Sequence, residues 1–341
     1  MKRCWMLLLW ALLCTACTAL PAEERSFAVA LGVDKQGTQW TACARVPTYQ
    51  TGGGYSTVRG EGETLEAALS ALDAGSPMQL HLGQLRMIVF TDDLAKTEDF
   101  PAALDALSAR HDLRMAASVA VTDTDLMTLM EAMNPANGSR LSKSLDVLIE
   151  TRIEQGTVLP AVLSDVIRMG ERQSPVLMHL SLSGKDVALS GGWPVSQRGV
   201  VTEPLPPEET QLLSLMLGQM TTGTLSLTEG TVRLTSATAQ TELSLPTMQE
   251  ASVRLTLRYT ASPLTEDALS RAVATACLGV LNRLSGMNCD ALGLARQAIS
   301  HAHDMDDWHD MDWAARYPDI VWSVSVGAEG ETGNSEFGIR N

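Results

Sequence analysis

Strand-like and helix-like segments alternate along the first half of the chain, and this alternation constrains the fold more than any other feature. Leu85–Thr91 is a short apolar run, typical of a buried strand. A helix is expected before it, because the capping residue Thr64 is followed by apolar residues at helical spacing: Leu65, Ala68, Leu69 and Leu72. Further strands are expected over Phe27–Asp34, Thr38–Pro47, Ser56–Gly62 and Leu113–Val121, and helices from Asp99, from Asp123, over Ser142–Glu154 and over Pro160–Met169. Regular alternation of this kind predicts an α/β layer.

The second half combines helices with strands of period two. Residues Ser252–Thr260 alternate strictly between apolar and polar side chains, as in a half-buried strand, and Ile320–Val326 repeats the pattern. Two or three helices are expected between them, beginning with Thr265–Ser285. The sequence therefore predicts a C-terminal α+β part, an antiparallel sheet with helices on one face.

The change of pattern near Ser174-Pro175 divides the chain. We expect a signal peptide (1–16), a lipidated Cys with its tether (17–26), an N-terminal α/β domain (27–175), a small middle domain or connector (176–222) and a C-terminal α+β domain (223–341). The middle piece contains an expected hairpin, Val176–Leu182 with Asp186–Ser190, and a helix over Glu208–Met220. The predicted fold class is α/β plus α+β in a multidomain chain.

The N-terminal segment has the layout of an export signal. Lys2 and Arg3 precede an unbroken apolar stretch, Trp5–Leu13, which ends in the small residues Thr15 and Ala16. A membrane-spanning helix needs about 20 apolar residues, so this stretch is too short to span a bilayer. We expect the globular part of the chain to be exported.

Cys17 directly follows this signal, as in the lipobox of bacterial lipoproteins, where the Cys sulfur carries a diacylglyceryl group. The position three residues before the Cys is usually Leu and here is Cys14. The alternative is an ordinary signal peptide with an incidental Cys17. The coincidence of apolar stretch, small residue and Cys favours lipid attachment at Cys17.

Charge and cysteine usage restrict the class of protein further. The chain has 25 Lys+Arg and 40 Asp+Glu, a formal charge of −15, so nucleic acid is not an expected partner. Beyond the signal, Cys43, Cys277 and Cys289 remain besides Cys17. From Cys277 the expected helix continues for eight residues to Ser285, about 12 Å away at 1.5 Å per residue. The next four residues would have to double back fully extended to bring Cys289 within disulfide distance of Cys277. We expect unpaired thiols, with Cys277 buried on the apolar face of its helix.

The densest group of potential metal ligands is Ser300–Asp312, with three His and five Asp. On a helix His301 and His303 lie about 200° apart, so they cannot share one ion. A face with Asp306, His309 and Asp310 remains conceivable, but we predict a solvated surface and no metal or other cofactor. No nucleophile elbow occurs, and the isolated His81, His111 and His179 have no evident nucleophile beside them, so no catalytic residue is predicted.

The order of several motifs resembles the Ger(x)C family, the lipoprotein C subunits of spore germinant receptors. The motifs are the lipobox Cys17, Phe27–Asp34, Gly60–Ala68, His81–Phe90, Cys289–Gly293 before a Trp-rich stretch, Tyr317-Pro318 and a closing strand. Two departures are Ala16-Cys17-Thr18-Ala19, where the family usually has Gly-Cys-Trp-Asp, and the His- and Asp-rich stretch near the C-terminus.

The resemblance implies three small domains, a location on the outer face of the spore inner membrane, and partnership with two integral membrane subunits, of the A type and the B type. It implies no catalytic motif. The leading hypothesis is therefore a non-catalytic, lipid-anchored subunit of a nutrient germinant receptor. The alternatives are a solute-binding lipoprotein of a transporter, which would need two similar α/β lobes, and a secreted metal-dependent hydrolase that uses the His- and Asp-rich segment.

Replacement of Cys17 by Ala should abolish labelling of the protein by a fatty-acid analogue and leave it soluble or uncleaved, because the sulfur is the attachment atom. Metabolic labelling followed by immunoprecipitation measures this. Undiminished labelling of the Cys17→Ala chain would contradict the assignment.

Overall fold

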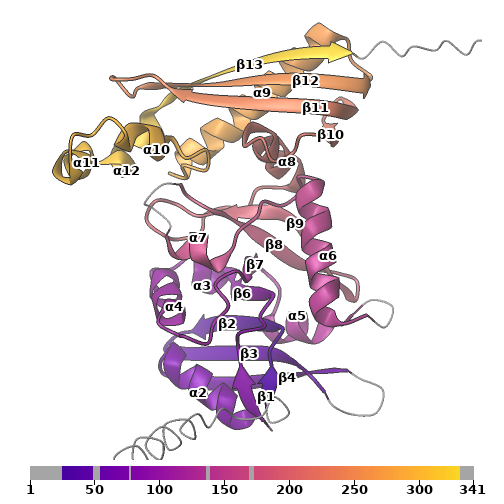
Figure 1. Ribbon diagram of the computed structural model, residues 1–341, viewed down its shortest axis with the longest axis vertical. Helices are drawn as coiled ribbons and strands as arrows, with labels where there is room; N and C mark the ends of the chain where they lie inside the picture. The colour runs from indigo at the N-terminus through magenta and orange to yellow at the C-terminus, as the bar shows by residue number, and fades with distance from the viewer. Residues whose placement is uncertain (1–24, 49–53, 77, 136–138, 169–172, 331–341) are drawn as a thin grey trace, which may run out of the picture.

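The computed structural model describes residues 25–48, 54–76, 78–135, 139–168 and 173–330. Cys17 lies outside these residues, so its lipidation stays a prediction. The described part is elongated, with an α/β part at one end and a small sheet with helices at the other (Figure 1). None of its helices combines the length and the apolar character needed to cross a membrane.

The α/β part is built on a seven-stranded sheet. Its strands, in spatial order, are β4 (Tyr55–Gly62), β3 (Gln39–Pro47), β2 (Ala30–Gln36), β6 (Met87–Thr91), β7 (Ser118–Thr122), β8 (Val176–Ser183) and β9 (Asp186–Pro194). The four central strands β2, β6, β7 and β8 are parallel, and β3, β4 and β9 extend the sheet in antiparallel pairs. A separate parallel pair joins β1 (Arg25–Phe27) to β5 (Gln79–His81).

Helices cover both faces of this sheet. One face carries α2 (Leu65–Gly75), α3 (Asp92–Ala95), α4 (Asp99–Ser108) and α7 (Leu163–Ile167). The opposite face carries α5 (Leu126–Ala132) and α6 (Leu141–Glu154). Each layer encloses its own apolar core, because a parallel sheet has to be covered on both sides. The predicted α/β layer is confirmed.

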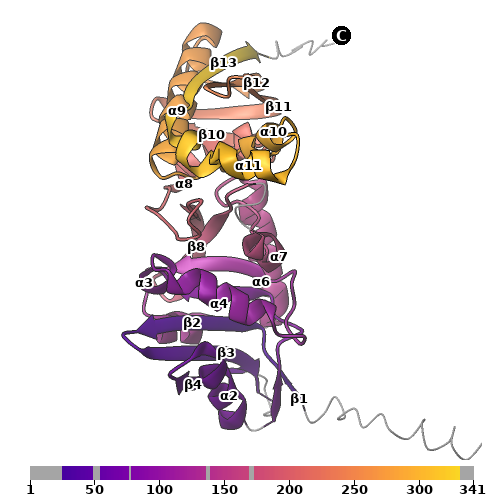
Figure 2. The ribbon, with the colours of Figure 1, turned by 90° about the vertical axis from the view of Figure 1, so that its left-hand side faces the viewer.

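The hairpin β8–β9 belongs to this sheet by its hydrogen bonds. Met178 and His179 pair with Ala120 and Val121 of the parallel strand β7. The sequence prediction instead placed these strands in a separate middle piece, since short strands do not reveal which sheet they join. Along the chain, α8 (Pro207–Met216) follows this sheet and precedes the C-terminal sheet, and Figure 2 shows it between the two.

The C-terminal part is a four-stranded sheet of β10 (Gly223–Leu227), β11 (Gly230–Leu243), β12 (Glu250–Ala261) and β13 (Val321–Gly330). Between β12 and β13 the chain forms α9 (Glu266–Gly286), α10 (Leu294–Ile299), α11 (Met305–Met311), α12 (Trp313–Arg316) and a 3₁₀ turn, Tyr317–Asp319. Val253, Leu255 and Leu257 of β12 are buried, whereas Arg254 and Thr256 are exposed, as the alternation predicts.

The fold class is confirmed, with one difference in the C-terminal sheet. Strand β13 pairs with β12 in the parallel direction, so the sheet is mixed and not purely antiparallel. The reason is the long helical crossover from β12 to β13, which returns the chain to the end of the sheet where β12 began.

Several element boundaries also differ from the prediction. Strand β7 begins at Ser118, five residues after the expected Leu113. Helix α5 is capped by Asp125 and not opened by Asp123, because the Asp125 carboxylate accepts the Thr128 N–H at 2.8 Å. Helix α7 begins only at Leu163, since Val162 forms a β-bridge with Ser118.

The glycine at position 60, in the Gly60–Ala68 motif, is explained by the close contact between α2 and β4. A Cβ atom on Gly60 would lie 2.2 Å from the Leu72 backbone nitrogen and 2.3 Å from the Ala68 carbonyl oxygen. These are backbone atoms, so a side chain can be accommodated only if the helix moves. The close approach of α2 thus requires glycine here.

Gly60→Ala should lower the free energy of unfolding by about 3 kcal/mol, because overpacking against fixed backbone is costly. The control is Gly279→Ala on α9, where an added Cβ meets no atom within 4 Å. That change should stabilise the chain by about 0.5–1 kcal/mol through helix propensity. Urea unfolding of both variants measures this, and an equal effect of the two would contradict the packing argument.

Candidate functional site: the junction of the two parts

The loop Asn288–Gly293, which follows α9, is built around a buried carboxylate. Asp290 is 1% exposed. One carboxylate oxygen accepts the Leu294 N–H at 2.8 Å, and the other accepts the Ala295 N–H at 2.7 Å and the Trp313 indole N–H at 3.2 Å. Burial raises the pKa of Asp290, although these hydrogen bonds favour the ionised form. The carboxylate thereby caps α10 and attaches the loop to α12.

The outer side of the same loop binds the α/β part. Its carbonyl groups accept hydrogen bonds from the Gln197 N–H (to Asn288, 2.9 Å), the Ser174 N–H (to Asp290, 3.0 Å) and the Gln173 side-chain amide (to Ala291, 2.5 Å). The Gln197 amide also donates to the Asn288 side chain at 3.1 Å. The loop that Asp290 holds in shape is therefore the surface on which the two parts meet.

A second contact between the parts is made by Gln211 of α8, which is 5% exposed. Its amide donates to the Gln155 carbonyl at 2.9 Å and to the Thr224 carbonyl at 2.7 Å, and its oxygen accepts the Ser226 N–H at 2.9 Å. One side chain thus links the end of α6 to β10. Gln211 was missed by sequence reasoning, because no local pattern distinguishes a buried Gln with three backbone partners from a solvated one.

Aromatic residues support the junction from the C-terminal side. Trp308, Trp313, Tyr317 and Trp322 form successive ring contacts with centroid separations of 6.2–6.5 Å. The Tyr317 hydroxyl donates to the Cys289 carbonyl at 2.8 Å, and burial raises the pKa of Tyr317 well above its ordinary value. The Tyr317-Pro318 motif therefore closes the other side of the Cys289–Gly293 loop.

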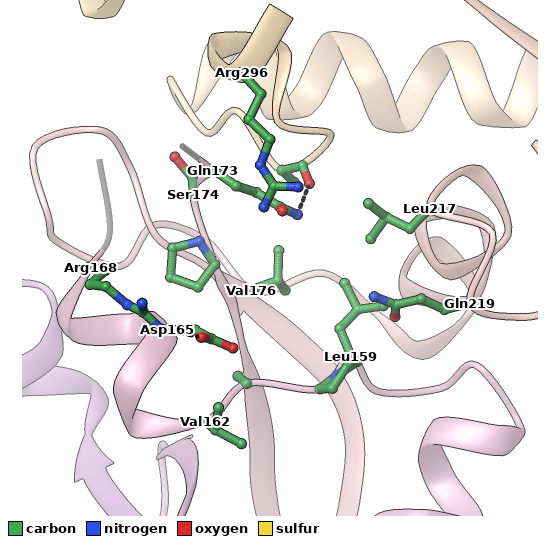
Figure 3. A pocket seen from close by; sticks show the side chains of 14 residues that line it. Leu159, Val162, Asp165, Arg168, Gln173, Ser174, Val176, Leu217, Gln219 and Arg296 are labelled. Atoms are coloured by element: carbon green, nitrogen blue, oxygen red, sulfur yellow. Dashed lines mark hydrogen bonds and ion pairs between the residues drawn. The ribbon is translucent and has the colours of Figure 1, made fainter. Parts of the chain in front are cut away.

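A cavity of about 380 Å³ opens at this junction. Residues of both parts line it, among them Arg296, Gln173 and Ser174, and Figure 3 shows the Arg296 side chain extending from above toward Gln173. Asp165 and Arg168 form an ion pair of 3.3 Å on another side. The described residues that line the cavity include no His or Cys, so they offer no pair of nucleophile and base. Their polar side chains are suited to binding a small polar solute or water.

Three of the His residues singled out in the sequence have partners in the described part of the chain. The exposed His303 precedes α11, the helix that Asp304 caps, and its side chain lies 3.2 Å from the carboxylate of Asp307 in that helix. His81 accepts the Gly83 N–H at 3.1 Å, and His179 lies 3.4 Å from Asp123. Within the described ranges no group of three or more His, Cys, Asp or Glu has the geometry to hold a metal ion.

The three cysteines of the described chain are unpaired and buried, which confirms the expectation for Cys43, Cys277 and Cys289. Burial raises the pKa of Cys43 and of Cys277 to about 12, so both stay protonated at neutral pH. These thiols are packing residues.

Comparisons with known proteins identify the family. Residues 19–182 match the family model of the spore germination protein N-terminal domain. This domain therefore belongs to the spore germination family, which confirms the predicted resemblance to the Ger(x)C family, the C subunits of spore germinant receptors. The crystal structure of the GerBC protein has the same fold, with a TM-score of 0.57 and 12% sequence identity over 88% of this chain and 96% of that chain. A comparison with curated proteins gives no match.

The likeness to GerBC covers both parts of this Ger(x)C chain, whereas the family model covers the first. Three motifs that carried the resemblance have defined roles in the structure. Gly60 allows α2 to approach β4, the His81 ring contacts Phe27 at a centroid distance of 5.5 Å with the rings tilted by 53°, and Cys289–Gly293 forms the junction. In this chain these motifs serve packing and domain contact.

Asp290→Ala should lower the free energy of unfolding of the C-terminal part by about 3 kcal/mol or more, because three buried N–H donors lose their acceptor. Urea unfolding followed by Trp fluorescence measures this, since Trp313 itself reports on the site. The matched control is Asp306→Ala on α11, an exposed Asp, which should change stability by less than about 0.5 kcal/mol. Equal unfolding curves for Asp290→Ala and the parent chain would contradict the assigned role.

Proposed function

We propose that this Ger(x)C chain is a non-catalytic lipoprotein subunit of a nutrient germinant receptor. In this proposal Cys17 carries the lipid that holds the protein on the outer face of the spore inner membrane, and the A-type and B-type integral membrane subunits are its partners. The observation that carries the proposal is the family match over residues 19–182, which begins two residues after Cys17.

The location follows from the sequence of the first 17 residues. The export signal puts the globular part outside the cytoplasm, and a diacylglyceryl group provides the two acyl chains that stable anchoring requires.

The role in signalling follows from what a surface subunit can do physically. It contributes contact free energy, and it can shift its membrane partners between conformations only by the difference in that energy. A rigid connection between the anchored part and the distal part lets such a contact act over the length of the molecule. We propose on this basis the division into an anchored domain (27–175), a connector (176–222) and a distal domain (223–341). The hairpin β8–β9, which begins the connector, is hydrogen-bonded to the sheet of the first domain.

A solute-binding lipoprotein is less well supported. Such proteins close two similar lobes around a cleft, but here one part has a seven-stranded, mainly parallel sheet and the other a four-stranded mixed sheet. The junction cavity has a volume of about 380 Å³, and the charged residues in its described lining are the neighbouring pair Asp165 and Arg168 and the single Arg296 of α10.

Deletion of the gene should leave sporulation intact and weaken germination with at least one nutrient. The Cys17→Ala chain should show a smaller loss, because a lipid raises the local concentration of the subunit without making its contacts. Release of dipicolinic acid and loss of refractility, scored against single nutrients, measure both. A host that forms no spores, or normal germination on every nutrient in a strain without a sister receptor, would defeat the proposal.

A further inference from the structure

A second pocket, of about 640 Å³, lies at the amino ends of the parallel strands β2 and β6. Its apolar wall includes Phe27, Val29 and Tyr55, and its polar wall includes Arg86, Arg140 and Ser142. It is separate from the junction cavity, with no lining residue in common. The combination of two arginines with an apolar wall is suited to an anionic ligand that has an apolar portion.

Arg86 is only partly satisfied within the described protein. Its Nε atom is buried without a hydrogen-bond partner. Its closest anion is Asp146, at 3.7 Å from Nη1, which is too long for a good hydrogen bond. Among the described residues, Asp146 forms the ion pair with the Arg86 guanidinium, and it offsets part of the positive charge of Arg86. Buried or half-buried donors of this kind are usually paired, so Arg86 has capacity for a further acceptor.

The first turn of α6 adds positive potential to the same pocket. Arg140 occupies the N-cap position and makes no capping hydrogen bond with its side chain, and the first turn contains Lys143 but no acidic residue. The Leu141 N–H is bound to the Tyr55 hydroxyl at 2.9 Å, which fixes the start of the helix against the pocket wall. The helix dipole and the two arginines of the lining therefore make this pocket cationic in a chain whose formal charge is −15.

The position of the pocket points to the source of its anion. The chain enters the described fold through β1, and Phe27 of that strand lines the pocket. Cys17 precedes Arg25 by eight residues, which span at most about 28 Å when fully extended. Helix α6 runs along the long axis with its first residues toward the end that holds β1, and the C-terminal sheet is at the far end (Figure 1).

We propose that this pocket binds the phosphate of an anionic phospholipid headgroup in the membrane to which the protein is anchored. The orientation rests on the lipid anchor proposed above, while the binding chemistry depends only on the pocket. Arginine guanidinium groups bind phosphate oxygens through paired N–H donors, and the apolar wall would contact the glycerol portion of the lipid. The site would fix how the molecule stands on the membrane, which a single lipid attachment does not do.

The test uses the whole exported chain, residues 18–341, so that binding is measured without the lipid on Cys17. Sedimentation with vesicles of mixed phosphatidylglycerol and phosphatidylcholine is compared with vesicles of phosphatidylcholine alone. Binding should occur only with phosphatidylglycerol and weaken with salt. Arg86→Gln with Arg140→Gln should reduce the association constant about thirtyfold, as expected for two cations at a membrane surface.

Ser142→Glu separates loss of binding from loss of folding. A carboxylate in the first turn of α6 favours the helix dipole, so the variant should be at least as stable as the parent while binding anionic vesicles less well. Arg254→Gln, on the exposed face of the C-terminal sheet, is the control and should bind as the parent does.

Equal vesicle binding by the parent and the double variant would overturn the proposal, as would absence of binding to phosphatidylglycerol. Binding of glycerol 1-phosphate or inorganic phosphate without binding to vesicles would overturn the lipid source. None of these outcomes depends on germination, so failure here is distinct from failure of the proposed receptor function.

Discussion

The burial of the Asp290 carboxylate is the interaction on which the arrangement of the two parts depends. A buried ionised group is costly unless it is well hydrogen-bonded, and three N–H donors from Leu294, Ala295 and Trp313 offset that cost. Those donors can converge only when the loop has one shape. The same shape presents the carbonyl groups of Asn288, Asp290 and Ala291 to the α/β part. A local capping interaction thus determines a contact between domains.

Other buried polar side chains act in the same way, by fixing one arrangement of backbone groups. The Arg45 guanidinium is 5% exposed and donates to the Met133 carbonyl at 3.0 Å and to the Asn134 side chain at 2.7 Å, which holds the end of α5 on the sheet. Burial lowers the pKa of Arg45. Such groups add little net stability on average, but each leaves unpaired donors or acceptors if its neighbours move. They therefore favour one defined structure of each part.

Sequence patterns predicted most helices and strands, because the burial of one face makes apolar residues recur at the spacing of a helix or of a strand. The alternation over Ser252–Thr260 gave a correct strand, and Thr64 was correctly expected to cap α2, since its hydroxyl accepts the Ala67 N–H. The pairing of strands that are far apart in the sequence could not be predicted from these patterns. The hairpin β8–β9 joins a sheet whose other strands are far away in sequence, and the parallel direction of β13 depends on the whole crossover. The junction was not predicted either, because the roles of Asp290 and Gln211 depend on partners from distant segments.

The junction indicates how one end of this chain can act on the other. The end that holds β1 carries the pocket with Arg86 and Arg140, and the opposite end presents a sheet whose outer face is polar. If the junction holds these ends as one body, a contact at one end is transmitted to the other without a flexible link. The central claim is therefore the rigidity of the junction.

The distance between spin labels at Glu66→Cys on α2 and Thr275→Cys on α9 tests this claim most directly. Both positions are exposed, and the thiols of the described residues are buried, so labelling is selective in the chain of residues 18–341, which lacks Cys17. Double electron–electron resonance should give one narrow distance distribution, which Asp290→Ala broadens. A broad or two-peaked distribution in the parent chain would contradict the account.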